Sequence, residues 1–124
     1  MISLAAPLFF YTENPMKLIK CIFRAEKLKE VVTNLESAVR GMTVSDVRGH
    51  GHQRGHSVVY RGLEYATPLL PKIMVEIAVD DNRVEDTVKL IIETARTGEI
   101  GDGRIFVQPL EANYHIRTGF MEID

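Results

Sequence analysis

The sequence predicts an α+β domain of the ferredoxin-like, split-βαβ type, in which an antiparallel sheet carries both helices on one face. Three observations lead to this fold class. Apolar periodicity gives the order strand, helix, strand twice in succession (βαββαβ), as expected for two βαβ halves in tandem. A long loop, about residues 49–70, joins the halves. The 124 residues, 45% of them hydrophobic, suffice for one domain with one modest core.

The first half begins with a short apolar run, residues 17–23, whose composition is typical of a strand buried on at least one face. A helix that ends near Gly41 follows, because apolar residues recur at helical spacing between polar ones. Those apolar residues are Leu28, Val31, Val32, Leu35 and Val39. Residues 42–48 then predict a second strand, which leads into the long loop.

The second half opens with a strand at residues 71–79, where Ile73, Val75, Ile77 and Val79 alternate with other residues. A helix begins after it, and Asn82 and Glu85 have the spacing of a capping box at its start. The expected core stripe of this helix is Val84, Val88, Ile91, Ile92 and Ala95. Residues 104–110 predict the last main strand, and residues 113–119 a short extra one.

Two helices on one face leave the other face of the sheet without cover. We expect that face to carry Ile, Val and Cys side chains, which favours burial against further subunits. The loop 49–70 is longer than most connections in compact domains, and such loops are usually functional or disordered. It is therefore the first place to look for function.

Composition narrows the class of protein. The formal net charge of -2 comes from mixed signs and gives no indication of nucleic-acid or membrane binding. The single cysteine, Cys21, allows no disulfide within the chain and favours a reducing cytoplasm and a buried thiol. Residues 1–15 have no Lys or Arg and are too short for a membrane span, so we expect a peripheral extension before a domain at 16–124. The alternative is a hydrophobic segment that docks on the domain or on a neighbouring subunit, because the apolar residues 8–11 are costly to leave in water.

The stretch "TGEIGDGR", residues 97–104, is a candidate anion site between a helix and a strand. Glycines let backbone N–H groups converge on an anion, and the cation Arg104 follows at once. An ordinary helix C-cap and turn explains this stretch equally well. We expect Arg117, in "HIRTG", to bring a second cation to the same strand end.

The loop "RGHGHQRGHSVVYRGLEY" suggests other chemistry. His50, His52 and His56 are candidate ligands for a transition metal, against the alternative of solvated loop histidines. Arginines and tyrosines also occur, but no nucleic-acid-binding motif does, so no nucleic acid is expected. Ser57 follows His56 without a third orienting group or a nucleophile elbow, so no catalytic centre is expected.

Several motifs together resemble the PII nitrogen-regulatory signal-transduction family, over residues 16–120. They are "GHQRGHSVVYRGLEY", "LPKIMVEIAV", "TARTGEIGDGRIFV" and "HIRTG". The resemblance implies a cytoplasmic homotrimer that binds ATP or ADP between subunits, with Mg²⁺ beside ATP and 2-oxoglutarate as effector. It implies that the loop 49–70, the T-loop of the family, contacts targets such as ammonium transporters and metabolic or modifying enzymes. The implied protein is a regulatory binding protein and no enzyme, and a slow ATPase is a third hypothesis.

The resemblance also implies roles by position. Gln53 would help hold Mg²⁺ shared by ATP and the effector, and Lys72 would pair with the effector's distal carboxylate. Tyr65 matches a nucleotidylylation site, whereas Leu63 stands where some relatives carry a phosphorylatable serine. The residues implied in nucleotide binding are Thr43, Gly49, Gly51, His52, Gln53, Glu76, Gly101, Asp102, Gly103, Arg104, His115 and Arg117. Of these, Arg117 matches a cation that the family contributes across the subunit boundary.

Three histidines depart from the family pattern. His50 stands where the family often has phenylalanine, and His52 and His115 stand where it often has arginine. Loss of a permanent charge near phosphate predicts a nucleotide affinity that is weaker or sensitive to pH near neutrality. A metal-responsive protein that uses the loop histidines on the same scaffold is the alternative to the nucleotide sensor.

Overall fold

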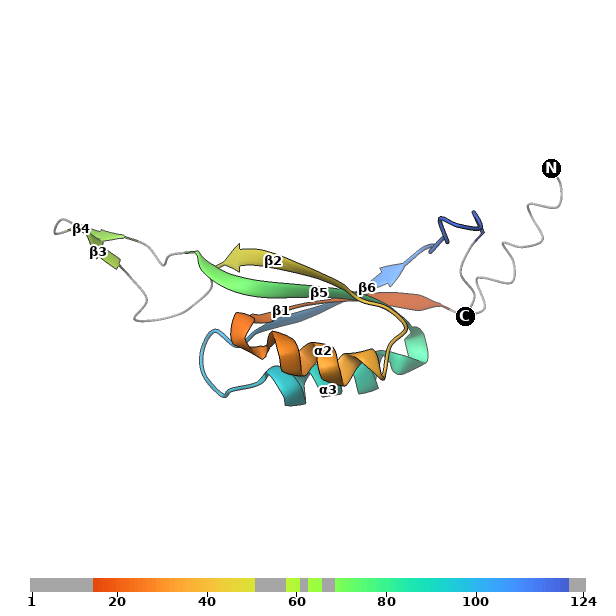
Figure 1. Cartoon of the computed structure of the whole chain (residues 1–124), viewed down its shortest axis with the longest axis horizontal. Coiled ribbons are helices and arrows are strands. Elements are labelled where there is room, and N and C mark those ends of the chain that lie inside the picture. The colour runs from red at the N-terminus through yellow and green to blue at the C-terminus, as the bar shows by residue number, and fades with distance from the viewer. Residues whose placement is uncertain (1–14, 51–57, 61–62, 66–68, 121–124) are drawn as a thin grey trace.

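The computed structural model describes residues 15–50 and 69–120, together with the backbone of residues 58–60 and 63–65 (Figure 1). The main elements in chain order are β1 (Met16–Arg24), α2 (Leu28–Glu36), β2 (Thr43–Gly49), β3 (Val58–Tyr60), β4 (Leu63–Tyr65), β5 (Leu70–Asp80), α3 (Val84–Ala95) and β6 (Gly103–Leu110). A short 3-10 turn precedes each helix, η2 (Ala25–Lys27) before α2 and η3 (Asp81–Arg83) before α3.

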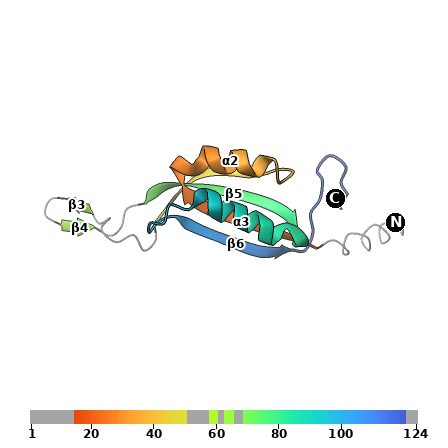
Figure 2. The same ribbon diagram turned by 90° about the horizontal axis from the view of Figure 1, so that it is seen from below.

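The four long strands form one antiparallel sheet in the order β2-β5-β1-β6, and both helices cover the same face of it (Figures 1 and 2). The central strands β1 and β5 come from different halves of the chain, as in a split-βαβ fold. The ferredoxin-like α+β prediction is therefore confirmed, and the predicted strands match β1, β2, β5 and β6 to within about a residue at each end.

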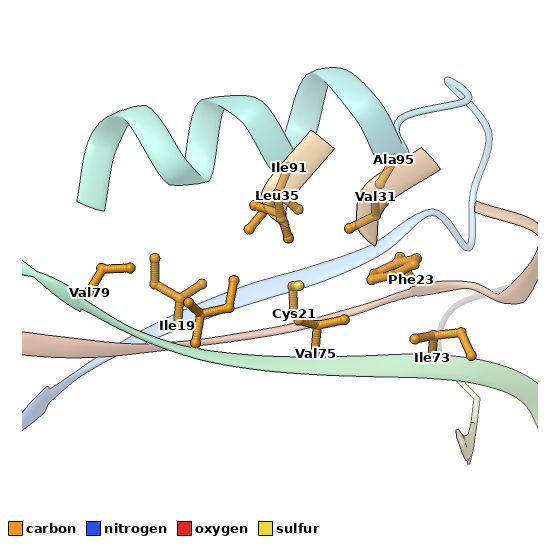
Figure 3. Close-up of a cluster of buried hydrophobic side chains, with 11 residues drawn as sticks. Ile19, Cys21, Phe23, Val31, Leu35, Ile73, Val75, Val79, Ile91 and Ala95 are labelled. Atoms are coloured by element: carbon orange, nitrogen blue, oxygen red, sulfur yellow. The ribbon is translucent and has the colours of Figure 1, made fainter. Parts of the chain in front are cut away.

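Alternating residues of the central strands form the core beneath the helices. β1 contributes Ile19, Cys21 and Phe23, each at most 2% exposed, and they meet the side chains of both helices in Figure 3. The other buried apolar residues are Val31, Leu35, Ile73, Val75, Ile77, Val79, Ile91 and Ala95. Cys21 thus faces the helices, so the expectation that it lies on the uncovered face is wrong.

The uncovered face carries the remaining alternate residues of the strands. Its apolar members include Leu18, Ile22, Val47, Met74 and Phe106, and Phe106 is 46% exposed. Lysine and glutamate share this face, because Lys20 and Glu76 lie opposite each other in the β1–β5 pairing with Nζ and Oε2 3.9 Å apart. One chain alone therefore leaves a mixed, largely apolar surface in contact with water.

The helices differ from expectation at their ends. α2 ends at Glu36, several residues before Gly41, although Val39 still packs against the core. The predicted capping box at Asn82 is wrong, because η3 takes up that residue and α3 begins without a side-chain cap. Ile92 of the expected core stripe is 38% exposed.

Two threonines complete the buried side of α3. The hydroxyl groups of Thr87 and Thr94 donate to the carbonyl groups of Arg83 and Leu90, four residues earlier. The Thr94 hydroxyl also accepts a bond of 3.0 Å from the Asn34 side chain, which links the two helices. The hydroxyl groups of both buried threonines therefore have hydrogen-bond partners. The spacing of apolar residues in the sequence did not predict that these two polar residues are buried.

The segment after β6 forms a turn and no extra strand. Gly119 N donates to the His115 carbonyl, His115 N donates to the Phe120 carbonyl, and Tyr114 makes a single bridge. The strand predicted for residues 113–119 is therefore wrong. The turn lies past Leu110, at the end of the sheet where β1 begins.

The long connection contains strands of its own, since β3 and β4 pair antiparallel. The other parts of the connection, residues 51–57, 61–62 and 66–68, lie outside the described residues, as do residues 1–14 of the expected extension. Pro15 is described, and its carbonyl accepts a bond of 2.9 Å from Asp81 N. Among the described helices, none is long and apolar enough to cross a membrane.

Candidate functional site

One end of each of the four long strands lies at the same end of the sheet. In the pairing registers, Phe23 lies opposite Gly103, Arg24 opposite Lys72, and Gly49 opposite Leu70. The last residues of β1 and β2 are therefore beside the first residues of β5 and β6. Two connections adjoin this end of the sheet (Figure 1). They are the turn between α3 and β6, residues 97–103, and the start of the long loop.

The glycines of this turn adopt left-handed backbone conformations. Gly101 has a φ of 102° and Gly103 a φ of 123°. Residues other than glycine rarely adopt φ values in this region. At Gly103 space is also restrictive, because a Cβ atom would come within 1.8 Å of the Ile22 carbonyl oxygen on β1. A glycine is therefore required where the turn enters β6.

The Asp102 side chain holds the turn together from within. Its carboxylate accepts bonds of 2.8 Å from the backbone N–H groups of Thr97 and Gly98, and one from the Thr97 hydroxyl. Arg24 Nε donates to Asp102 Oδ1 over 3.0 Å, and Arg24 Nη2 donates to the Ile100 carbonyl over 2.8 Å. Partial burial alone would raise the pKa of Asp102, but the bonds from Thr97, Arg24 and Gly98 outweigh it and hold that pKa well below its usual range.

Lys72 reaches the same turn from β5. Its side chain is largely buried, and Nζ donates to the Gly101 carbonyl over 2.8 Å. Burial lowers the pKa of Lys72, and the neighbouring charge of Arg24 lowers it further, whereas Glu26 and Asp102 act in the opposite direction. An ammonium in this setting is a strong partner for an anion that reaches it.

These groups surround an open cleft of ≈ 510 Å³. Of the residues implied in binding, Gly49, Lys72, Gly101, Asp102, Gly103 and Arg104 line it. His50, Glu99, Ile100, Ile22 and Phe106 complete its lining. The cleft combines glycine-rich backbone with the cations Lys72 and Arg104, so it is suited to an anionic ligand.

Comparison with known proteins decides the family. The family model described as Nitrogen regulatory protein P-II matches residues 16–120. Similar relatives, all called nitrogen regulatory protein P-II, include those of Nostoc punctiforme (53% identity), Methanothermobacter thermautotrophicus, there called P-II 1 (50%), and Pasteurella multocida (48%). Each match spans 105 residues, which are 84% of this chain and 91–94% of the relative.

The chain belongs to the P-II family of nitrogen regulatory proteins. The resemblance noted in the sequence is thereby confirmed. Family membership supports a role as a nitrogen-regulatory signal-transduction protein, and the names of the relatives are those of regulators.

Two residues matched to the P-II pattern lie away from the cleft. Thr43 and Glu76 are directly opposite each other in the β2–β5 pairing, on the uncovered face of the sheet. Neither lines the cleft of the single chain.

His115 and Arg117 lie past the opposite end of β6 from the turn. The eight residues of β6 span roughly 25 Å. The expectation that Arg117 reaches the same strand end as Arg104 is therefore wrong within one chain. Gly51, His52, Gln53 and the side chain of Tyr65 lie outside the described residues.

The histidine cluster of the alternative hypothesis is only partly described. His50 lines the cleft, but His52 and His56 are outside the described residues. Within the part of the chain that the structure describes, no group of three or more His, Cys, Asp or Glu residues has a geometry suited to a metal ion. No observation on the described residues favours the metal-responsive alternative.

Arg24 is the site residue that inspection of the sequence missed. It belongs to none of the glycine-rich or histidine-rich motifs, yet it makes two bonds to the turn in this P-II family member. The signal was present in the fold prediction, because the split-βαβ topology brings the end of the first strand beside the start of the last. A cation at that strand end lies next to any anion site at the turn.

Proposed function

We propose that this protein senses ATP or ADP together with 2-oxoglutarate and controls partner proteins of nitrogen metabolism through the loop 49–70. The observation that carries the proposal is the cleft in which the glycine-rich turn 97–103 and the ammonium of the largely buried Lys72 meet. Family membership supports the same reading. The protein acts by binding, with Thr43, Gly49, Glu76 and the turn among the nucleotide-contacting residues.

The phosphate end of the ligand fits the turn. Backbone N–H groups around left-handed glycines form concave sites for anions, and Arg104 adds a fixed positive charge on the same lining. The Asp102 carboxylate is held within the turn, where its oxygens accept bonds from Thr97 N, Gly98 N and Arg24 Nε. Gln53 would contribute to holding Mg²⁺, which supplies neutralisation of phosphate charge.

The carboxylate end of the effector fits Lys72. This side chain is mostly withdrawn from water, so an ion pair formed there is screened weakly. Its ammonium has one described acceptor, the Gly101 carbonyl, and three N–H bonds to donate. A dicarboxylate such as 2-oxoglutarate can therefore be bound at one end without breaking the contact to the turn.

Assembly as a homotrimer would complete the site. Leu18, Ile22, Met74 and Phe106 on the uncovered face favour burial against other copies. In the proposed trimer, Arg117 and His115 come to the cleft from a neighbouring chain, which accounts for their distance from the turn in one chain. Ligand and assembly would then stabilise each other.

Signalling would follow from linkage between the ligand and the loop. The first residues of the long connection, Gly49 and His50, line the cleft, so a ligand there contacts the base of the loop. If ATP with 2-oxoglutarate and ADP favour different loop states, the population competent to bind a partner shifts. Ammonium transporters and metabolic or modifying enzymes of the cytoplasm are the proposed partners, and Tyr65 is the proposed modification site.

Isothermal titration calorimetry tests the proposal. ATP with Mg²⁺ is titrated into the full chain first, and 2-oxoglutarate is titrated into the ATP-loaded protein afterwards. We expect saturable binding in both steps, and much weaker 2-oxoglutarate binding when ATP is omitted. Absence of 2-oxoglutarate binding to the ATP-loaded protein would contradict the effector part of the proposal, and absence of ATP binding would contradict all of it.

A further inference from the structure

Arg24 stands behind the glycine-rich turn, at the end of β1. Its guanidinium bridges two acceptors, Oδ1 of Asp102 at 3.0 Å from Nε and the carbonyl of Ile100 at 2.8 Å from Nη2. The side chain is 21% exposed and the Asp102 side chain 25% exposed, so most of this pair is withdrawn from water. The pair ties the first strand of the fold to a turn that lies 76 to 78 residues later in the chain.

A carboxylate inside a phosphate-binding turn presents an electrostatic difficulty. Asp102 is ionised, and a negative charge there repels a polyphosphate in the adjoining cleft. Three of the donors to Asp102 are neutral, namely the Thr97 and Gly98 N–H groups and the Thr97 hydroxyl. The charged donor is Arg24, which balances the carboxylate as a unit charge.

We infer that Arg24 is a positioning residue of the anion site, which neutralises Asp102 and holds the turn in the shape that lines the cleft. The inference rests on the proposed nucleotide binding. Arg24 does not line the cleft itself, and its effect therefore passes through Asp102 and Ile100. A planar guanidinium can bond both acceptors at once, whereas a lysine ammonium is a single point donor on a flexible stem.

The geometry also connects Arg24 with the effector end of the cleft. Arg24 and Lys72 are directly opposite in the β1–β5 pairing, and their two acceptors, the carbonyl groups of Ile100 and Gly101, are consecutive in the turn. A displacement of the turn by loss of Arg24 would therefore move the acceptor of Lys72 as well. We expect Arg24 variants to weaken both the phosphate and the effector contacts.

The test compares ATP affinity, measured by calorimetry at low salt, with the affinity for adenosine, which lacks phosphate. Arg24→Gln should weaken ATP binding about tenfold or more, with adenosine binding changed less than about twofold. Arg24→Lys should recover part of the ATP affinity, because charge returns without the second bond. The matched control is Lys27→Gln, which removes one positive charge from the neighbouring 3-10 turn, where Lys27 pairs with Glu30, and should leave ATP affinity unchanged.

A double-mutant cycle separates positioning from a general loss of structure. Arg24→Gln and Asp102→Asn, combined, should weaken ATP binding less than the sum of the two single effects, since the second change removes the charge left unbalanced by the first. Circular dichroism checks that each variant is folded. If Arg24→Gln does not fold, Arg24→Lys carries the test, with an expected loss of several-fold against wild type.

The outcomes are distinguishable from failure of the proposed function. If wild type does not bind ATP, the proposed function itself is wrong. If wild type binds ATP and Arg24→Gln binds it as well as Lys27→Gln does, the inference is overturned. It is likewise overturned if ATP and adenosine lose affinity equally, or if the effects of Arg24→Gln and Asp102→Asn add without coupling.

Discussion

Arg24 and Lys72 lie directly opposite each other on the two central strands, and both donate to the turn before β6. Like charges at directly opposed positions of an antiparallel pair are normally destabilising. Here each cation has an oxygen acceptor within 3.0 Å, and the negative charge of Asp102 acts on both of them. The turn thereby accepts hydrogen bonds from side chains of both halves of the chain. Its shape therefore depends on how the strand ends pack at this end of the sheet.

Replacement of Lys72 by Met should weaken effector binding strongly and retain ATP binding. Methionine keeps an apolar stem in this largely buried position but lacks the ammonium. A charged hydrogen bond contributes about 1.5–3 kcal/mol, so 2-oxoglutarate affinity should fall about tenfold to 100-fold. Calorimetry with ATP-loaded protein measures it, and Lys27→Met is the control. Unchanged 2-oxoglutarate affinity in Lys72→Met would show that the effector binds elsewhere.

Two glycines of the turn should differ in their tolerance of alanine. At Gly98 a Cβ atom meets nothing within 4 Å, so Gly98→Ala should cost about 1–2 kcal/mol from its positive φ alone. At Gly103 a Cβ atom would overlap the Ile22 carbonyl, so Gly103→Ala should lose more than about 3 kcal/mol or fail to fold. Urea denaturation measures both free energies of unfolding. Equal losses would mean that β1 moves away without cost.

Asp102 should make stability depend on pH in the acid range. Its folded-state pKa lies below the unfolded value of about 3.9, so its contribution is present above that pH and is lost as the pH falls towards the folded-state pKa. Asp102→Asn should therefore lower the free energy of unfolding by about 1–3 kcal/mol at pH 7, and the difference from wild type should shrink below about pH 4. Urea titrations at several pH values test this, with Asp46→Asn, at an exposed position on β2, as control. A difference that stays constant down to pH 3 would contradict it.

Cys21 should be inert in the native protein. Burial raises the pKa of its thiol to about 11, although a backbone hydrogen bond with Val75 acts in the opposite direction. A thiol reagent at pH 8 should therefore label the native chain very slowly and the urea-unfolded chain rapidly, to one thiol per chain. Rapid labelling without urea would show that the core under the helices opens readily.

A charge on the uncovered face of the sheet should prevent assembly. Phe106→Asp places a carboxylate on the surface that we propose to be buried in the trimer, so light scattering should give a monomer mass where wild type gives a trimer. Ile92→Asp, at a similarly exposed position on the helical side, should remain a trimer. The proposed interface is wrong if both variants assemble as wild type does.

The fold could be predicted closely from the sequence, because the spacing of apolar residues determines which side chains a strand or helix buries. Ile73, Val75, Ile77 and Val79 alternate in the sequence and are all buried on β5. The predictions that failed depend on local hydrogen bonds at the start of α3 and along it. Asn82 has capping-box spacing but belongs to a 3-10 turn, and the polar threonines of α3 are buried through bonds to their own helix that no apolar pattern reveals.

The site was predicted unevenly for a related reason. Gly101, Gly103 and Arg104 lie close together in the sequence, so a single sequence motif identifies all three. Arg24 is not part of any motif, because its role depends on the register that sets Phe23 beside Gly103. Arg117 was expected at the same strand end as Arg104, but it follows the opposite end of β6, so the strand separates it from the turn within one chain.

The length of β6 has a further consequence for the proposed trimer. The turn that holds Arg117 follows the end of β6 opposite to Gly101, so roughly the length of the strand separates the two residues within one chain. A nucleotide held by both would act as a crosslink between neighbouring chains. Its apparent affinity would rise with protein concentration, and dilution below the assembly threshold would release it even when free nucleotide is abundant.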